Sequence, residues 1–553
     1  MSSTEGKIPK HSGTLTLSWT NKHLRLLSHE GGTYEWVDPK DFRVSEVRLL
    51  QDEKSVGTVH AEKNRAKDNL LIRGDSLHAL TSLLRIPEFA EEYEGKVKLV
   101  YIDPPFNTGQ AFTHYDDGLE HSVWLTMLRD RLVQIRKLLS DDGSVWVHLD
   151  DYEVHRARVV IDEIFGSQNF VASIVWRSAD TGNYDAKQFS VDHNTILVYS
   201  RNAGWRANPV VRTEAQSSHY ANPDNDPRGP WFDGNPLGSP NPRENLRYNI
   251  ESPTGHLIKH PPNGWRWSRE TLDKKLGTGE VRFSPDGKRI ILRTYLWEQK
   301  DLPPSTLWDD TSITGSNRKA KNELKKLFNL QAKQVFDTPK PESLMRRILE
   351  IATNPGDVVL DCFAGSGTTA AVAHKMGRRW ATVEWSAENL ANFTLPRLEK
   401  VVNGSDQGGI SEVINWNGGD GFRVMDIAPS VYEIYGNSVL LSESVTAGEL
   451  AESVAAQLGF DYEPDGVFAA TKGRMRLAVI DGVFNNDIAR MLTSLLKEKE
   501  RVTVVATAAE PGSEDLLLGL SSGSKLRKVP RDLAKLSAKR SQVVQLVLEG
   551  LEG

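Results

Sequence analysis

One short segment begins as an apolar strand, stops at two prolines, and constrains the fold more than any other part of the sequence. It is KLVYIDPPFNTG, residues 98–109. Proline fixes its own φ and cannot donate a backbone hydrogen bond, so Pro104 and Pro105 end the strand abruptly. We therefore expect Asp103 and Phe106 to lie at the carboxyl end of a buried strand. In open α/β sheets that edge is where ligands bind.

Strand-like and helix-like segments alternate on both sides of a central region of different character. NLLIRGDSLHALTSLL, residues 69–84, predicts a strand, a Gly-Asp turn and an amphipathic helix. This alternation predicts an α/β fold with a doubly wound, mostly parallel sheet. The central region is rich in Pro, Gly, Asn and Trp, which favours an inserted α+β module. We expect a strand-rich N-terminal extension (1–67), two halves of one α/β domain (68–200 and 336–405), the insert (201–335) and a small C-terminal α/β domain (420–553).

Composition and charge narrow the class of protein. The 553 residues are 39% apolar, which is enough to bury several cores. The single cysteine, Cys362, excludes an internal disulfide and a cysteine-rich metal site. We find no signal peptide and no apolar run of membrane-spanning length, so we expect a cytoplasmic protein without membrane attachment. The net charge is -6, yet Lys and Arg outnumber Asp and Glu by 23 to 16 in residues 201–340. That distribution suits a central segment facing a polyanion.

A second segment, VVLDCFAGSGTTAA (residues 358–371), predicts a ligand site. A strand ends at Asp361, and a turn with Gly365 and Gly367 leads into a helix, so the backbone can approach a ligand closely. The segment lacks the lysine of a phosphate-binding loop and the third glycine of a dinucleotide fingerprint. Asp361 suits a cationic amino group, and Glu384, at the end of the next strand, suits ribose hydroxyls. An amino acid joined to a nucleoside describes S-adenosylmethionine.

DPPF at 103–106 together with FAGSG at 363–367 resembles the paired signature of amino-methylating DNA methyltransferases. The catalytic motif precedes the cofactor motif, which is the permuted order of the β class. The longer match runs through GDSLHAL, KVKLVYIDPPFNTG, WLTMLRDRL and HLDD. It is similar to the modification (Mod) subunit of type III restriction-modification systems and to solitary relatives. The resemblance implies a Rossmann-like, S-adenosylmethionine-dependent methyltransferase that modifies adenine N6 in duplex DNA, in a bacterium or archaeon, as part of restriction-modification or phage defence.

The resemblance implies roles for the catalytic tetrapeptide. Asp103 and the carbonyl of Pro104 would accept hydrogen bonds from the amine of the target base, and Phe106, after Pro105, would stack on that base. Two aligned acceptors favour a pyramidal nitrogen whose lone pair points at the methyl group, which stabilises the transition state. Because the amine lies inside the duplex, the base must be flipped out, at a cost of a few kcal/mol.

The same resemblance implies the cofactor site. Phe363, Gly365 and Gly367 would line the cleft, Asp361 would lie near the amino group, and Glu384 would hold the ribose. Asp75 matches an acidic position near the adenine of the cofactor, although it can equally be a turn cap. Lys340 matches a segment that packs by the methionine end.

The insert supplies target recognition under this hypothesis. Arginine and lysine interleaved with tryptophan offer phosphate clamps and base-edge donors. The candidates are Arg243, Arg247, Trp265, Arg266, Trp267 and Arg269, although a tryptophan cluster is more often a small core than a stacking platform.

Alternatives remain open. Asp in the first motif position favours adenine N6, while cytosine N4 is a second acceptor for this class. RNA or protein amide methylases usually carry Asn-Pro-Pro-Tyr and lack a basic insert of this size. A catalytically silent DNA-binding subunit of a defence complex is a further hypothesis. By analogy with Mod subunits, we expect the C-terminal domain to support a homodimer or to dock a helicase-nuclease restriction subunit.

Overall fold

The computed structural model describes most of the chain, and its residues fall into two compact units. The described residues are 15–28, 33–39, 41, 43, 46–107, 120–212, 214–234, 237–331, 335–435, 438–442 and 445–529. One unit comprises residues 1–207 and 305–553, and the other comprises residues 208–304. Residues 1–14 of the expected N-terminal extension and residues 530–553 of the expected C-terminal domain lie outside the described residues.

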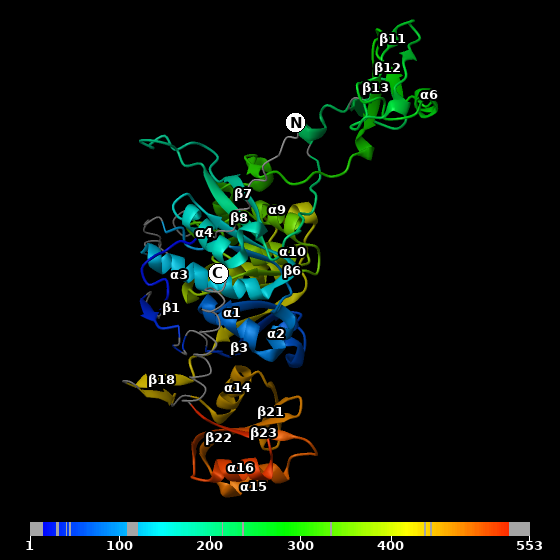
Figure 1. Ribbon diagram of the computed structural model, residues 1–553. Helices are drawn as coiled ribbons and strands as arrows, with labels where there is room; N and C mark the ends of the chain where they lie inside the picture. Colours follow the sequence, from blue (N-terminus) through cyan, green and yellow to red (C-terminus); the bar gives the residue numbers. More distant parts are fainter. Residues whose placement is uncertain are drawn as a thin grey trace. The chain divides into compact units, whose positions relative to one another are not determined.

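The larger unit is built on a mixed, mostly parallel sheet (Figure 1). Within the described residues its ten strands lie in the order β14 (Leu307–Trp308), β7 (Phe170–Arg177), β8 (His193–Ser200), β6 (Leu139–Leu149), β5 (Val97–Ile102), β15 (Val358–Asp361), β16 (Arg379–Glu384), β4 (Asn69–Arg73), β17 (Gly421–Ile427) and β3 (Leu50–Gly57). The antiparallel pairs are β6 with β8, β7 with β8, and β17 with β3. The α/β fold predicted from the sequence is confirmed.

Helices cover both faces of this sheet. One group contains α1 (Ser76–Arg85), α2 (Pro87–Tyr93), α3 (His121–Leu138) and α4 (Val154–Phe165), and the other contains α9 (Glu342–Ala352), α10 (Thr368–Lys375) and α12 (Leu395–Val402). Val100 and Ile102 of β5 share a core with α1, α3 and α4. Leu99 and Tyr101 are equally buried but alternate with them, so they face the other side. Both faces are therefore covered, as a mostly parallel sheet requires.

Strands β5 and β15 are parallel neighbours at the centre of the sheet. Because the carboxyl ends of parallel strands meet at the same edge, the residues that follow Ile102 and Asp361 come together there. This pairing joins two segments that lie more than 250 positions apart in the sequence.

The domain boundaries differ from the expected ones at three places. β3 belongs to the large sheet, although it falls in the expected extension 1–67. β17 lies between β4 and β3, although it falls in the expected C-terminal domain 420–553. β14 pairs with β7, so the insert expected over 201–335 ends earlier, at residue 304. Each is a strand whose partner is distant in sequence, and only pairing reveals where it belongs.

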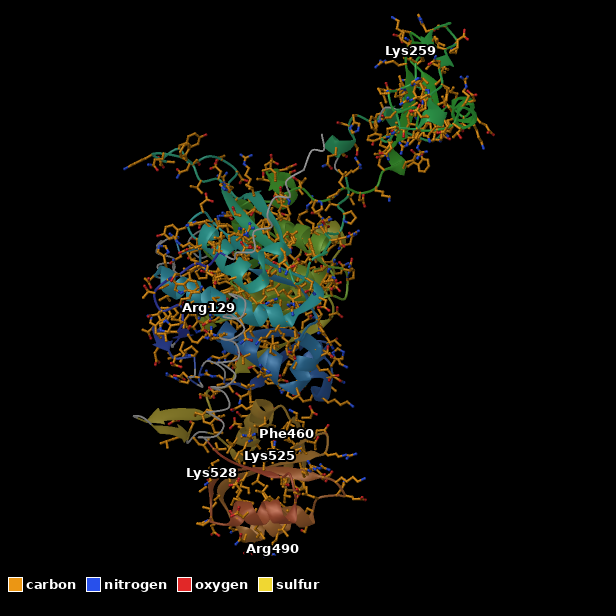
Figure 2. The ribbon with its side chains drawn as sticks, in the orientation of Figure 1. Arg129, Lys259, Phe460, Arg490, Lys525 and Lys528 are labelled. Carbon is orange, nitrogen blue, oxygen red and sulfur yellow. The ribbon has the colours of Figure 1, made fainter. Side chains whose placement is uncertain are left out.

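The unit of residues 208–304 has its own small core. β9 (Trp231–Asp233), β12 (Val281–Phe283) and β13 (Ile290–Tyr295) form an antiparallel sheet in the order β12-β13-β9. A hairpin of β10 (Ile250–Glu251) and β11 (Leu257–Ile258) and the helix α6 (Arg269–Gly277) complete the unit. The buried residues of its core cluster are Leu237, Ile250, Trp265, Leu272 and Val281. Lys259, labelled in Figure 2, lies in this unit. Lys and Arg outnumber Asp and Glu here by only 14 to 12.

The C-terminal region contains a second sheet within the larger unit. Its strands are β20 (Asp461–Asp465), β21 (Phe468–Lys472), β22 (Met475–Phe484), β23 (Arg501–Ala509) and β24 (Lys525–Lys528), paired in that order. Helices α14 (Ala447–Leu458), α15 (Asn486–Ser494) and α16 (Ser513–Leu520) pack with them. Figure 2 labels Phe460, which is buried in one core of this sheet, and Lys525 and Lys528 on β24.

The remaining elements are short. Apart from the 12-residue helix α8 (Asn317–Phe328) and several 3-10 turns, they are β1 (Arg25–Ser28), β2 (Tyr34–Val37), α5 (Glu214–Ser217), α7 (Thr311–Thr314), α11 (Ala387–Asn389), a π-helical turn (Leu390–Thr394), α13 (Ser411–Ile414), β18 (Tyr432–Tyr435) and β19 (Ser438–Leu441). In the ranges that the structure covers, we find no helix with the length and apolar character needed to cross a lipid bilayer.

Candidate active site

The loop that follows β5 is held in place by side chains from neighbouring elements. The indole Nε1 of Trp124 on α3 donates a hydrogen bond to the carbonyl of Pro105, at 2.7 Å. Phe106 stacks on the ring of His148 from β6, with 5.9 Å between ring centroids and 24° between planes. Asn107 adopts a φ of 62° and donates to the buried carboxylate of Glu153, at 2.8 Å. The loop Asp103–Phe106 is therefore fixed before any ligand arrives.

Asp103 forms an ion pair with a lysine from a distant segment. Lys340 Nζ lies 2.5 Å from Asp103 Oδ2 and 5.1 Å from the centre of the Phe106 ring. Lys340 itself is buried, and its carbonyl accepts a hydrogen bond from Thr368 Oγ1 at the start of α10. Burial raises the pKa of Asp103, and the ammonium of Lys340 opposes that rise.

The turn that follows β15 needs glycine at two positions. Gly365 and Gly367 have φ angles of 52° and 74°, which side chains rarely adopt. A Cβ on Gly365 would approach the Phe336 ring to 3.1 Å, and one on Gly367 would approach Thr394 Cγ2 to the same distance. Thr394 also donates to the carbonyl of Gly365, at 2.7 Å. The glycine turn is therefore packed closely against the π-helical turn that ends at Thr394.

Two carboxyl groups organise the glycine turn. Asp361 accepts a hydrogen bond from the amide of Phe363, at 2.9 Å. Glu384, at the end of β16, accepts from the amides of Gly365 and Ser386, at 2.8 and 2.9 Å. Burial raises the pKa of both groups to about 7. Near neutral pH a cationic ligand would therefore shift these carboxyls toward their charged forms.

Asp75 has two roles in the structure. It is the N-cap of α1, where its side chain accepts from the amide of Leu77, and it pairs with Arg131 of α3 at 3.0 Å. Burial alone would raise the pKa of Asp75, but Arg131 holds it below the ordinary value. The turn cap considered from the sequence is present, and Asp75 also lines the cavity described next.

One cavity of about 920 Å³ connects these groups. Its wall contains all four residues of the Asp103–Phe106 loop and also Asp75, Lys340, Asp361, Phe363, Gly365 and Glu384. Ligand pockets in proteins typically measure about 300 to 1,000 Å³. The candidate residues from both sequence motifs thus face one space, with Gly367 directly behind the turn as the N-cap of α10.

Several residues of the site were not identified from the sequence. Trp124 and Arg131 occupy buried positions of α3, where they follow the helical pattern of core residues. His148 is fully buried beneath Phe106, and its Nδ1 lies 2.8 Å from the hydroxyl of Tyr101. Burial, followed by the charge of Lys340, holds the pKa of His148 well below its usual range, so the ring is neutral. These residues lie in the segments WLTMLRDRL and HLDD, and the match of those segments to the family was the signal by which the sequence could have identified them.

The structure separates the six candidate DNA contacts of the insert into two kinds. Trp265 is only 6% exposed, and its Nε1 donates to the carbonyl of Tyr248 at 2.6 Å, so it is a core residue. Trp267 packs beside that core, with Lys275 Nζ 4.9 Å from its ring. The tryptophans therefore support the unit, which corrects the expectation of a DNA contact for Trp265. The arginines are all exposed: Arg243, Arg247, Arg266 and Arg269.

Two of the exposed arginines are engaged within the unit itself. Arg247 pairs with Glu244 at 2.8 Å, and Arg269 pairs with Asp273 at 3.0 Å. Pairs between exposed side chains contribute about 0 to 1 kcal/mol, so an anion could displace either partner at little cost.

Comparison with known proteins identifies a family. The profile of the DNA methylase family matches residues 97–393, which is more than half of the chain. A probable type III restriction-modification enzyme, the HindVI Mod subunit of Haemophilus influenzae, is 29% identical over 466 residues, which cover 71% of this chain and 58% of that protein. The EcoP15I Mod subunit of Escherichia coli is 30% identical over 423 residues, covering 64% and 61%.

A type II enzyme is also similar. The methyltransferase M.EcaI of Enterobacter cloacae is 28% identical over 349 residues, covering 61% of this chain and 72% of that protein. The chain spans about three fifths of the length of the two Mod subunits. The matched range includes both β5 and β15 with their loops, so the resemblance predicted from the motifs is confirmed. This chain belongs to the DNA methylase family.

Proposed function

We propose that this protein is a site-specific DNA methyltransferase that transfers a methyl group from S-adenosylmethionine to N6 of adenine in duplex DNA. One observation carries the proposal: the loop Asp103–Phe106 and the glycine turn at Gly365 line the same cavity. We call Asp103–Phe106 the acceptor loop, because the Asp103 carboxylate and the Pro104 carbonyl can accept hydrogen bonds. A transfer between two ligands requires that both reach one space in a fixed relative position.

The loop after β5 provides what an aromatic amine needs to react. Asp103 Oδ1 is buried and, among the described residues, has no hydrogen-bond partner, so it can accept one N–H of the amine. The carbonyl of Pro104 would accept the second, and the Phe106 ring would stack on the flipped base. Acceptors aligned in this way stabilise the pyramidal nitrogen of the transition state. The chain needs no covalent nucleophile for this step.

The residues of the glycine turn fit S-adenosylmethionine. Around this turn, the wall of the cavity combines buried carboxyls with the apolar ring of Phe363, which suits a cation joined to a nucleoside. Asp361 would hold the amino group, Glu384 the ribose hydroxyls, and Phe363 the adenine. Asp75 would lie near the base end of the cofactor. When bound, the cofactor supplies the methyl group, while the protein residues hold both reactants and exclude water.

We assign target recognition to the unit of residues 208–304. Exposed arginines, among them Arg243 and Arg266, supply the charge for phosphate contacts and donors for base edges. Such an enzyme would act in the bacterial or archaeal cytoplasm, where the chromosome is.

Methyl transfer tests the proposal directly. The purified chain is incubated with tritiated S-adenosylmethionine and genomic DNA, and the labelled DNA is digested to nucleosides and separated. We expect label in N6-methyl-2′-deoxyadenosine, and single-molecule sequencing of the undigested DNA should place the methylated adenines at a specific sequence. Label in N4-methylcytosine would establish the cytosine alternative, and DNA binding without any transfer would favour the silent subunit.

We further propose that the C-terminal sheet supports a homodimer or docks a helicase-nuclease restriction subunit, by analogy with the Mod subunits. Light scattering on the whole chain and on a chain ending after Pro429 tests dimerisation. The cut lies beyond β17 because that strand belongs to the large sheet. A dimer that persists after truncation would remove the dimerisation role.

A further inference from the structure

We propose that Lys340 belongs to the acceptor side of the site, where its ammonium holds one oxygen of Asp103 and leaves the other oxygen for the amine of the target base. This inference rests on the proposed function, because it assigns a positioning residue to that reaction. It differs from the resemblance, which implies that Lys340 lies by the methionine end of the cofactor.

The two oxygens of Asp103 have different surroundings. Oδ2 is 2.5 Å from Lys340 Nζ. Oδ1 is buried and, within the described part of the chain, accepts no hydrogen bond. A buried acceptor without a partner carries a desolvation cost, so it is a strong point of attachment for an incoming donor. The wall of the cavity includes Asp103, so the residue that carries this atom borders the space that the base would enter.

Lys340 is held where it can do this. It directly precedes Pro341, which is the N-cap of α9 and is followed by Glu342, and the Lys340 carbonyl accepts from Thr368 Oγ1. Glu342 is buried and pairs with Lys375 and Arg397, at 2.8 and 2.9 Å. The backbone at Lys340 is therefore tied to the start of α10, and the side chain reaches Asp103 from a fixed point.

The role of the ammonium follows from the chemistry of a carboxyl. A protonated Asp103 would carry a hydrogen on one oxygen and lose much of its strength as an acceptor. Burial favours this neutral form, and Lys340 favours the ionised form. The other titratable groups facing the pair are Asp361, whose charge disfavours ionisation, and the neutral Tyr101 and His148. Lys340 is the cation that keeps the acceptor charged.

The cation also contacts the stacking ring. Lys340 Nζ lies 5.1 Å from the centre of Phe106, within the range of a cation–π contact. The same ammonium therefore touches both residues that the target base would meet, the acceptor and the stacking surface. This arrangement places the ammonium of Lys340 beside the residues that the base would meet.

The pH dependence of kcat tests the inference. We compare the wild type with Lys340→Arg, Lys340→Gln and Lys340→Met, using saturating DNA. Without the cation, Asp103 ionises at higher pH, so the acidic limb of the profile should move up by about one to three pH units in the Gln and Met variants. Lys340→Arg should keep the wild-type limb. The affinity for S-adenosylmethionine, measured by calorimetry, should change less than about twofold, or under about 0.4 kcal/mol.

Controls separate this role from a merely structural one. Lys497→Gln changes an exposed lysine of the C-terminal region and should leave both readouts unchanged. Lys340→Gln keeps a donor of similar length, so it remains informative if the Met variant does not fold. A limb that stays in place in the Gln variant overturns the inference. So does a parallel loss of cofactor affinity in all three variants, which would place Lys340 at the methionine end. A wild type that transfers no methyl group contradicts the proposed function instead.

Discussion

The acceptor loop of the cavity and the exposed arginines of residues 208–304 differ in how their side chains are held. Asp103 and Phe106 are fixed by Lys340 and His148. Arg266, in contrast, is exposed on a unit whose strands are two to six residues long. On the proposed function, groups for chemistry are positioned before binding, whereas exposed groups for recognition are held weakly enough to adapt to a partner.

The largest effect should come from the core of the small unit. Trp265→Ala removes a buried indole, and we expect it to destabilise residues 208–304 by about 3 to 5 kcal/mol. Hydrogen exchange should show lost protection in this unit, and cofactor binding in the other unit should be unchanged. If protection stayed intact while DNA binding disappeared, Trp265 would be a stacking platform, and the division between core and contact residues would be wrong.

The pH dependence of cofactor binding tests the buried groups that line the cavity. Burial raises the pKa of Asp361 to about 7, so this carboxyl is mostly neutral at pH 6 and mostly ionised at pH 8. Only the ionised form attracts a cationic amino group. We therefore expect the affinity for S-adenosylmethionine to rise about tenfold from pH 6 to pH 8. Calorimetry on Asp361→Asn should give a weaker and flatter profile, and a flat wild-type profile would contradict this role.

A smaller effect should follow from loosening the acceptor loop. Trp124→Phe keeps an aromatic ring at this position but loses the indole N–H and its hydrogen bond to the carbonyl of Pro105. We expect kcat to fall about fivefold, corresponding to about 1 kcal/mol, with cofactor affinity preserved. An unchanged kcat at saturating DNA would show that this bond does not position the loop.

The smallest effect should come from a single exposed arginine. Arg266→Ala should weaken DNA binding about threefold and reduce the salt dependence by about one counterion, without changing kcat. Fluorescence anisotropy at several salt concentrations measures both, with Lys497→Gln as the control. A large loss of kcat would mean that Arg266 takes part in the chemistry.

The site residues that stand out in the sequence are those that restrict or free the backbone directly. Pro104 and Pro105 end a strand, and Gly365 and Gly367 permit positive φ, wherever they occur. The pairing of Lys340 with Asp103 could not be predicted, because it joins residues 237 positions apart. His148 also escaped notice, since a histidine within a buried strand resembles any core residue.

The fold likewise contains elements that could be predicted from the sequence and elements that could not. The α/β alternation predicted β4, α1 and β5 because each element carries its own pattern of apolar residues. The placement of β17 between β4 and β3 could not be predicted, since GFRVMDI follows a glycine-containing linker and looks like the start of a new domain. Pairing between distant strands, unlike local pattern, leaves no signal in a single sequence.

The central claim is that acceptor and methyl donor occupy neighbouring parts of one cavity, each held by its own residues. Measuring both cofactor affinity and methyl transfer in Asp103→Ala and Glu384→Ala tests it most directly. We expect Asp103→Ala to bind S-adenosylmethionine normally and to transfer about 10² to 10³ times more slowly, and Glu384→Ala to lose cofactor affinity. Transfer at the wild-type rate by Asp103→Ala, or loss of cofactor binding in that variant, would contradict it.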